Sequence, residues 1–420
     1  MRLTLSRSQR NMLRLLVFLV VGLNWLVVPA SADDIRGRQW HLDAMSADEL
    51  WKSGKGAGVV VAVIDSGVNA VPELQGQVIE HKRIGGAPPR EDVAGRSHGT
   101  AMASVIAGTG RSGGVKGLAP EAKIMSLETN HTDLRIFGNS AVYPWIRAIK
   151  YAVDHGARVI SISQAGTGIS GEELRKLEAA IEYAHEKGAL VFASTGNGAK
   201  DGNPLEYPAG FSAAVGVAAV DQSGKVADFS TYGSQVDFAA PGVGIPVRCG
   251  GGEAFCVQDG TSPATALASA SAALIWSKHP TWTNNQVLRV MMQTASKPEG
   301  KVPSKYIGYG IIRPGQVLID GKGDPGDPDV NPLLPEEKEQ AKPTHQPSAV
   351  PSGSSPDSGK GSDSEEAQRA AEGVAASGGS GGGDGGSGLL WPVLGTGAGV
   401  AVIGGAVFYL RRRQPRSSMY

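Results

Sequence analysis

The sequence predicts an α/β domain built around a mainly parallel β-sheet. From residue 59 to about residue 319, short apolar runs of strand length alternate with longer segments in which apolar residues recur at helical spacing. This alternation is typical of βαβ units, in which helices cover the faces of parallel strands. The 420-residue chain changes in composition on either side of this region. We therefore expect one folded domain, 58–320, with flanking segments of other kinds.

The individual elements follow from hydrophobic periodicity and from turn residues. The continuous apolar run 59–64 fits a strand that is buried on both faces, and it ends at Asp65. Val142, Trp145 and Ile149 recur on one face of a helix. On the same criteria we expect further strands at 122–127, 159–163, 190–193, 213–220 and 236–239, and further helices at 101–107, 172–187 and 284–295.

The charge balance gives no support to a nucleic-acid partner. Lys and Arg together number 40, as do Asp and Glu, so the formal net charge is zero. Domains that bind nucleic acids usually show a basic excess or a basic patch.

The first 32 residues are typical of a secretory signal peptide. Arginines precede an apolar run at 15–28 that is too short for a comfortable membrane span, and Ala30-Ser31-Ala32 fits a cleavage site. The alternative is an uncleaved anchor. Residues 33–57 form a short extension, too short to be a folded pro-domain. Its hydrophobic anchors are Trp40, Leu42, Met45, Leu50 and Trp51.

The residues after Asp320 predict a tether, a membrane span and a basic tail. The 321–388 segment is rich in Pro, Gly, Ser, Asp and Glu, so it buries too little apolar surface to fold and is predicted to be disordered. Residues 389–410 are apolar and uncharged over the length of a transmembrane helix. The basic tail 411–420 then lies in the cytoplasm and the domain outside. The alternative for 389–410 is a hydrophobic disordered tail.

The chain has two cysteines, Cys249 and Cys256. In an exported protein, one pair is most simply a disulfide, which here would close a small loop. The alternatives are two free thiols or a metal pair that lacks its other ligands.

A serine stands at a turn that leads into a helix of small residues. Gly260-Thr261-Ser262 precedes Pro263, which suits the first position of a helix, and alanines then recur to residue 273. Unpaired N–H groups and the helix dipole favour negative charge at such a point, as an acyl-transfer nucleophile requires. For an isolated Thr-Ser, the simpler interpretation is an N-capping serine.

Three other polar residues make the nucleophile interpretation the stronger one. Asp65 ends the first strand, His98 stands before Gly99-Thr100, and Asn197 ends another strand. Singly, each fits a turn or a helix start. Together, the order Asp65, His98, Ser262 is that of the subtilisin triad. The sequence resembles the subtilisin-like serine protease family. The blocks that carry this resemblance are Val63-Ile64-Asp65-Ser66-Gly67-Val68, His98-Gly99-Thr100, Ala193-Ser194-Thr195-Gly196-Asn197 and Gly260-Thr261-Ser262.

The resemblance implies a three-layer fold and a set of roles. Ser262 would attack the scissile carbonyl, His98 would act as base and then acid, and Asp65 would orient His98. The Asn197 amide and the Ser262 backbone N–H would hold the oxyanion, a role for which subtilisin itself is the standard example. Two segments would bind the substrate, namely Ser163, Gln164 and Ala165, and the first-pocket residues Ala193, Ser194, Thr195 and Gly196.

No cofactor or metal is expected. Many relatives carry a calcium loop soon after the histidine, but residues 108–117 contain no carboxylate here, and calcium needs several oxygen ligands. Gln164 and Ala165 also depart from the leucine and glycine that are common in the family, which leaves the pocket's preference open.

The order of segments is similar to that of the mycosins, membrane-anchored proteases of type VII secretion systems. This resemblance implies protein substrates, a domain outside the membrane and an association with the secretion machinery. A second hypothesis is a structural component of such a complex, with a protease fold and little activity. An esterase is disfavoured because the Gly-x-Ser-x-Gly elbow is missing at Ser262.

Overall fold

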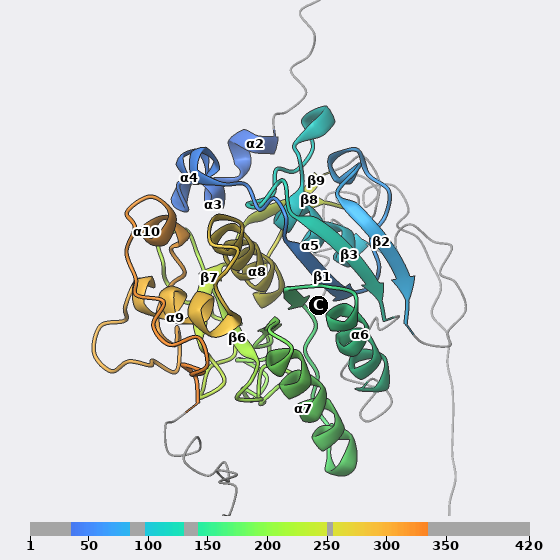
Figure 1. Cartoon of the computed structure of the whole chain (residues 1–420), viewed down its shortest axis with the longest axis vertical. Coiled ribbons are helices and arrows are strands. Elements are labelled where there is room, and N and C mark those ends of the chain that lie inside the picture. Colours follow the sequence, from blue (N-terminus) through green and yellow to red (C-terminus); the bar gives the residue numbers. More distant parts are fainter. Residues whose placement is uncertain (1–34, 85–96, 130–141, 250–254, 335–420) are drawn as a thin grey trace, which may run out of the picture. The chain divides into compact units, whose positions relative to one another are not determined.

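The computed structural model describes residues 35–84, 97–129, 142–249 and 255–334 (Figure 1). The predicted signal peptide, the predicted span, the basic tail and most of the predicted linker lie outside these residues, so those assignments stay predictions. Within the described ranges, no helix has both the length and the apolar character that crossing a membrane requires.

Seven strands form the central sheet, in the order β2-β3-β1-β4-β5-β6-β7, and each neighbouring pair is parallel. The predicted α/β fold with a mainly parallel sheet is confirmed. The strands are β1 (Val60–Asp65), β2 (Val78–Arg83), β3 (Lys123–Glu128), β4 (Val159–Ile162), β5 (Leu190–Ser194), β6 (Val215–Val220) and β7 (Phe238–Pro241).

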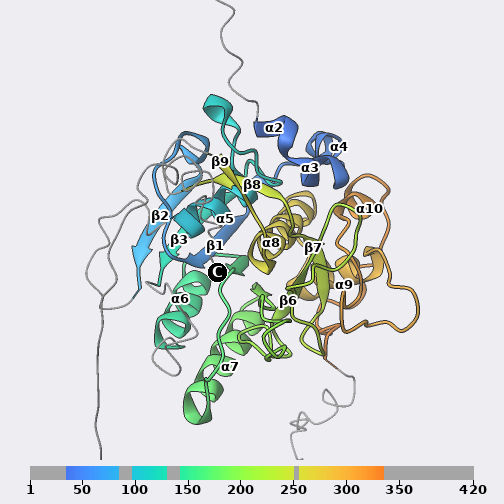
Figure 2. The same ribbon diagram turned by 180° about the vertical axis from the view of Figure 1, so that it is seen from behind.

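Helices cover both faces of the sheet, which gives the predicted three layers (Figures 1 and 2). In β1, Val61 and Val63 belong to one hydrophobic cluster, whereas Ala62 and Ile64 belong to the other. The first cluster contains α5 (Ser97–Ala107), α8 (Thr261–Lys278), α9 (Asn284–Thr294) and α10 (Pro314–Leu318). The second contains α6 (Val142–Asp154) and α7 (Gly171–Glu186).

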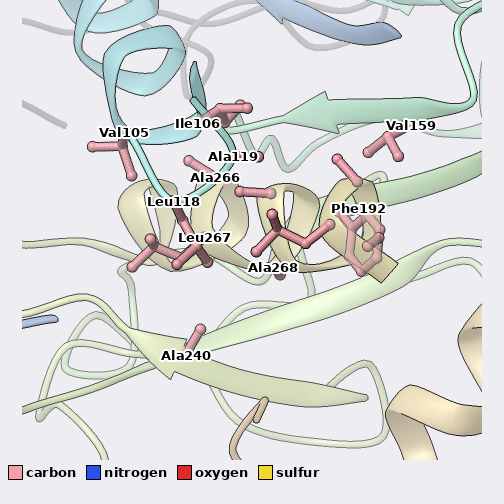
Figure 3. Close-up of a cluster of buried hydrophobic side chains, with 14 of the residues drawn as sticks. Val105, Ile106, Leu118, Ala119, Val159, Phe192, Ala240, Ala266, Leu267 and Ala268 are labelled. Atoms are coloured by element: carbon pink, nitrogen blue, oxygen red, sulfur yellow. The ribbon is translucent and has the colours of Figure 1, made fainter. Parts of the chain in front are cut away.

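Helix α8 is buried from Thr261 to Trp276. Its many alanines allow close packing against α5, β4, β5 and β6, and Figure 3 shows Ala266, Leu267 and Ala268 in the same cluster as Phe192 of β5. Three of its buried hydroxyls are satisfied within the helix, since Thr265, Ser269 and Ser271 each donate to the carbonyl four residues earlier at 2.8 Å. This packing fixes the position of the N-terminal turn of α8, where Ser262 lies.

The N-terminal extension is packed as part of the domain. It forms three short helices, α2 (Ile35–Arg38), α3 (Trp40–Ala44) and α4 (Ala47–Ser53). Leu42 and Leu50 are fully buried in the cluster that contains α5 and α8. The Trp51 indole donates to the carbonyl of Leu118 at 2.9 Å, and the Trp40 indole donates to the carbonyl of Gly244 at 3.1 Å. The predicted hydrophobic anchors therefore have partners in the core.

Two strand regions were not predicted. The edge strand β2 reads VIEHKR and alternates in burial, so it lacks the continuous apolar run that marks the inner strands. The antiparallel hairpin of β8 (Ile245–Arg248) and β9 (Phe255–Gln258) has only short strands. The structure pairs Cys249 with Cys256 at this hairpin, with Cα atoms 5.6 Å apart. The disulfide in the exported protein stays a prediction.

Residues 321–334 are folded against α9, although composition assigned them to the disordered linker. The Arg289 guanidinium donates to the carbonyls of Asp327 and Val330 at 2.7 and 2.6 Å. The Asn285 amide donates to the carbonyl of Pro328 at 2.9 Å. A segment of low hydrophobicity can thus be held through its backbone carbonyls, a contact that composition does not register.

Candidate active site

The end of β1 and the start of α5 bring Asp65 and His98 into contact. His98 Nδ1 lies 2.9 Å from Asp65 Oδ1 and 3.0 Å from Asp65 Oδ2. Asp65 is fully buried and also accepts the backbone N–H of Ser66 at 2.7 Å, while the His98 side chain is 19% exposed. The carboxylate thus orients the imidazole through Nδ1, so that Nε2 is the nitrogen that can act on a substrate.

Glycine at position 99 makes this approach possible. A Cβ on Gly99 would lie 2.3 Å from the carbonyl oxygen of Gly67 and 3.2 Å from Asp65 Cβ. Two hydrogen bonds join the same pieces, because Gly99 N–H donates to the Ser66 hydroxyl at 3.1 Å and Asn69 N–H to the Thr100 hydroxyl at 2.9 Å. The Asp-Ser-Gly and His-Gly-Thr blocks therefore form one interlocked unit.

His98 holds a proton more strongly in this pair than a histidine exposed to water does, because its pKa is raised. Burial disfavours the imidazolium, but the charge of Asp65 and its hydrogen bond together outweigh burial and raise the pKa of His98 above its ordinary value of 6.5. The histidine can consequently accept a proton readily while Asp65 stays beside it.

Ser262 lies in the first turn of α8, next to the end of β4. Its Oγ donates to the carbonyl of Ser163 at 2.8 Å, and the Ser163 hydroxyl donates back to the carbonyl of Ser262 at 3.1 Å. Within the described residues, the Ser262 hydroxyl is thus bonded to Ser163 and not to His98. Catalytic hydrogen bonds are often incomplete without substrate, and a turn about χ1 would redirect the hydroxyl.

Asn197 is held at the head of the same helix. Its Oδ1 accepts the backbone N–H of Thr261 at 2.9 Å and the Thr261 hydroxyl at 3.0 Å. With the oxygen engaged in this way, the amide nitrogen is directed elsewhere, 3.5 Å from where a Cβ on Gly260 would stand. The arrangement presents an N–H₂ donor close to the N-terminus of α8.

The sequence reasoning missed the part played by Thr261. Its hydroxyl lies 2.5 Å from the Ser194 hydroxyl and accepts the backbone N–H of Gly196 at 3.3 Å, besides its bond to Asn197. One buried threonine thereby ties the end of β5 to the start of α8. The Gly-Thr-Ser block was the available signal, but which partners Thr261 takes depends on the fold.

The predicted substrate segments leave β4 and β5 side by side, because Ile162 is in register with Ala193. The Gln164 side chain is buried, and its Oε1 accepts the Trp145 indole N–H at 3.1 Å and the Thr129 hydroxyl at 3.2 Å. It therefore points into the domain, away from a substrate. Ala165 is partly exposed and follows directly.

The second segment also turns its side chains inward. Ala193 is buried, Ser194 contacts Thr261, and the Thr195 hydroxyl donates to the carbonyl of Val217 at 3.2 Å. Gly196, with a positive φ of 102°, follows without a side chain. Gly196 is itself buried, and Glu206 Oε1 would lie 2.0 Å from a Cβ placed on it.

The described residues contain no group of three His, Cys, Asp or Glu side chains that could hold a metal ion. The stretch after α5 contains a short 3₁₀ turn, Arg111–Gly113, and the Thr109 hydroxyl there donates to the carbonyl of Glu73 at 2.9 Å. The expectation of an enzyme without a metal or cofactor stays a prediction.

Comparisons with known proteins show which proteins this chain is similar to. The family model described as Peptidase_S8, Subtilase family, matches residues 56–310. The thermostable alkaline protease of Halalkalibacterium halodurans is 33% identical over 284 residues, which are 66% of this chain and 72% of that protein. The solved structure of MycP1 from the ESX-1 type VII secretion system has 27% identity and a TM-score of 0.60, and covers 69% of this chain and 88% of its own. A chain of the periplasmic assembly from the ESX-5 inner membrane complex has 25% identity and a TM-score of 0.57, with 79% and 92% covered.

Proposed function

Because this chain belongs to the subtilase family and is a serine endopeptidase, we propose that Ser262 is its nucleophile, with His98 as the acid–base group and Asp65 as the orienting carboxylate. The observation that carries this assignment is the paired contact of His98 Nδ1 with both oxygens of Asp65, at 2.9 and 3.0 Å. It leaves Nε2 as the nitrogen that exchanges protons with Ser262.

In the proposed reaction the Ser262 hydroxyl leaves Ser163 and donates to His98 Nε2. Its oxygen attacks the scissile carbonyl as its proton passes to His98, and the resulting imidazolium is stabilised by Asp65. His98 then protonates the leaving amine, and an ester of Ser262 remains. A water molecule, deprotonated by His98, cleaves this ester and restores the hydroxyl.

The developing oxyanion would be held at the head of α8. The Asn197 N–H₂ group and the Ser262 backbone N–H are the proposed donors, aided by the dipole of a helix that runs from Thr261 to Lys278. The bonds from Thr261 to Asn197 Oδ1 support this role, since they fix the amide before any substrate binds.

We further propose that the enzyme is anchored outside the cell membrane and acts with a type VII secretion system on protein substrates. The predicted signal peptide and the predicted span at 389–410 support the anchor. MycP1 belongs to the ESX-1 type VII system, and another structural neighbour belongs to the ESX-5 inner membrane complex. The competing function is a structural component with little activity, and the neighbour in that assembly is the observation that favours it.

Hydrolysis of a quenched fluorescent protein substrate by the full-length chain separates the two. The proposed function predicts cleavage that Ser262→Ala abolishes. Ser269→Ala is the matched control, because Ser269 is a buried serine two turns further along α8 that bonds only within the helix. Cleavage that Ser262→Ala does not slow would overturn the assignment of Ser262, and a folded parent that cleaves nothing would leave the structural role.

A further inference from the structure

The side chain of Glu206 reaches the face of Gly196, in the predicted first-pocket segment. A Cβ placed on Gly196 would lie 2.0 Å from Glu206 Oε1, and one on Gly198 would lie 3.5 Å from the same oxygen. Two glycines thus leave room for this carboxylate. Glu206 belongs to an irregular stretch and no motif marked it, so sequence reasoning missed it.

The backbone around Glu206 closes the space between the two substrate segments. Tyr207, the next residue, pairs with Gly166 through two hydrogen bonds, at 2.9 and 3.0 Å. Gly166 continues the Ser163 segment, and Gly196 continues the β5 segment. Glu206 therefore lies between the two segments, with its neighbour Tyr207 paired to Gly166 and its carboxylate at the face of Gly196.

A substrate residue must insert between these same segments. Ser262 Oγ is 2.8 Å from the Ser163 carbonyl on one side, and Asn197 is bonded to Thr261 on the other. The attacked carbonyl has to lie between Ser163 and Asn197. The side chain of the residue that carries this carbonyl is attached one atom away, so it enters between the segments, toward Gly196.

We propose that Glu206 is the specificity-determining residue for the position before the cut, and that this position takes a cationic side chain, lysine or arginine. The inference rests on the proposed function of Ser262. A carboxylate in a partly enclosed site pairs well with an ammonium or a guanidinium group, and arginine can bind it through two parallel hydrogen bonds. An apolar side chain would displace water from the carboxylate without replacing its hydrogen bonds, and an acidic one would repel it.

The test compares matched peptides that differ only in the residue before the cut, with arginine, lysine, leucine or glutamate there. For the full-length chain, we expect kcat/KM for arginine and lysine to exceed that for leucine by about 10- to 100-fold, the range that a hydrogen bond to a charged group supplies. Glu206→Gln should remove most of this ratio, and Glu206→Lys should favour glutamate. Asp201→Asn, which removes an exposed charge nearby along the chain, should leave the ratio unchanged.

Labelling of Ser262 by a fluorophosphonate keeps the two hypotheses apart, because the probe carries no residue before a cut. A parent and a Glu206→Gln variant that both label, but share the same preference among the peptides, would overturn the role of Glu206 alone. A parent that labels but cleaves the leucine peptide faster than the arginine and lysine peptides would also overturn the role of Glu206. A folded parent that does not label would overturn the proposed catalysis, and this inference with it.

Discussion

At the scale of single residues, the contact of His98 with Asp65 and the bonds that hold Asn197 are formed before a substrate arrives. Asn197 is the clearest case, because both bonds to its Oδ1 come from Thr261, the residue that precedes the nucleophile. The amide nitrogen is thereby aimed without help from the substrate. Donors fixed in advance stabilise a transition state more than mobile ones, since no reorganisation is needed during the reaction.

Asn197→Asp tests this donor with little change of shape. The carboxylate can still accept from Thr261 but cannot donate, so we expect kcat to fall by about 10²- to 10³-fold with a small change in KM. Steady-state kinetics on a peptide substrate measures both constants, and Asn203→Asp is a control on a nearby asparagine whose amide donates to the carbonyl of Tyr232 at 2.8 Å. An unchanged kcat in Asn197→Asp would contradict the assignment.

The raised pKa of His98 predicts the acid limb of activity. Catalysis needs the neutral imidazole, so kcat/KM should be lost as the pH falls through a midpoint above 6.5, the ordinary value for histidine. Asp65→Asn removes the charge that raises this pKa, so it should shift the midpoint to lower pH and also slow the reaction. A pH profile of kcat/KM measures both effects. A midpoint that Asp65→Asn leaves in place would mean that another group controls it.

The contact between His98 and Asp65 could be predicted because both residues stand in short blocks with glycine, where the backbone needs a particular residue. Gly99 is required because a Cβ there would lie 2.3 Å from the Gly67 carbonyl oxygen, and His98 is the residue before it. Side-chain direction could not be predicted in this way. Gln164 turns inward to Trp145, and Ser262 bonds Ser163, because of neighbours that only the fold supplies.

At the scale of elements, helix α3 contains a buried histidine, and its burial makes the stability of the packed extension depend on pH. His41 is fully buried, and within the described residues neither ring nitrogen has a hydrogen-bond partner. Burial and the nearby Arg36 charge lower its pKa to about 3, against a smaller opposing effect of Asp43. His41 is therefore neutral when α3 is docked near neutral pH.

This burial predicts an acid-labile fold. The unfolded chain takes up a proton near pH 6.5 but the folded chain only near pH 3, so the free energy of unfolding should decrease as the pH falls between these values. Urea unfolding at pH 7 and pH 4 measures the loss. The free energy of unfolding of His41→Phe should fall less between these pH values than that of the parent. His155→Gln, a change at an exposed histidine, should show the same fall as the parent. Equal losses in the parent and His41→Phe would contradict this account.

Which elements the sequence predicts depends on how they are buried. Inner strands such as β1 and β4 appear as mainly apolar runs, and their predicted ranges agree with the structure within about two residues. The edge strand β2 and the β8–β9 hairpin escaped because they are partly exposed or short. Residues 321–334 escaped because Arg289 holds them through their backbone carbonyls, which composition does not register.

At the scale of the whole molecule, the proposed arrangement is a catalytic domain on the extracellular side of the cell membrane, held there by a tether and one membrane span. Removal of 389–410 should release the chain from the membrane fraction while leaving the folded domain active, because the described core ends before residue 335. Fractionation of cells that express the parent or this deletion measures the distribution. A deletion variant that stays in the membrane fraction would show that other residues anchor the chain.

The central claim is that Asp65, His98 and Ser262 work as one nucleophilic unit. The most direct measurement is covalent labelling of the full-length protein by a fluorophosphonate, with the modified residue located by mass spectrometry. The account predicts an adduct on Ser262 in the parent and greatly reduced labelling in His98→Ala and Ser262→Ala. A folded parent without an adduct, or labelling that persists in Ser262→Ala at another residue, would contradict it.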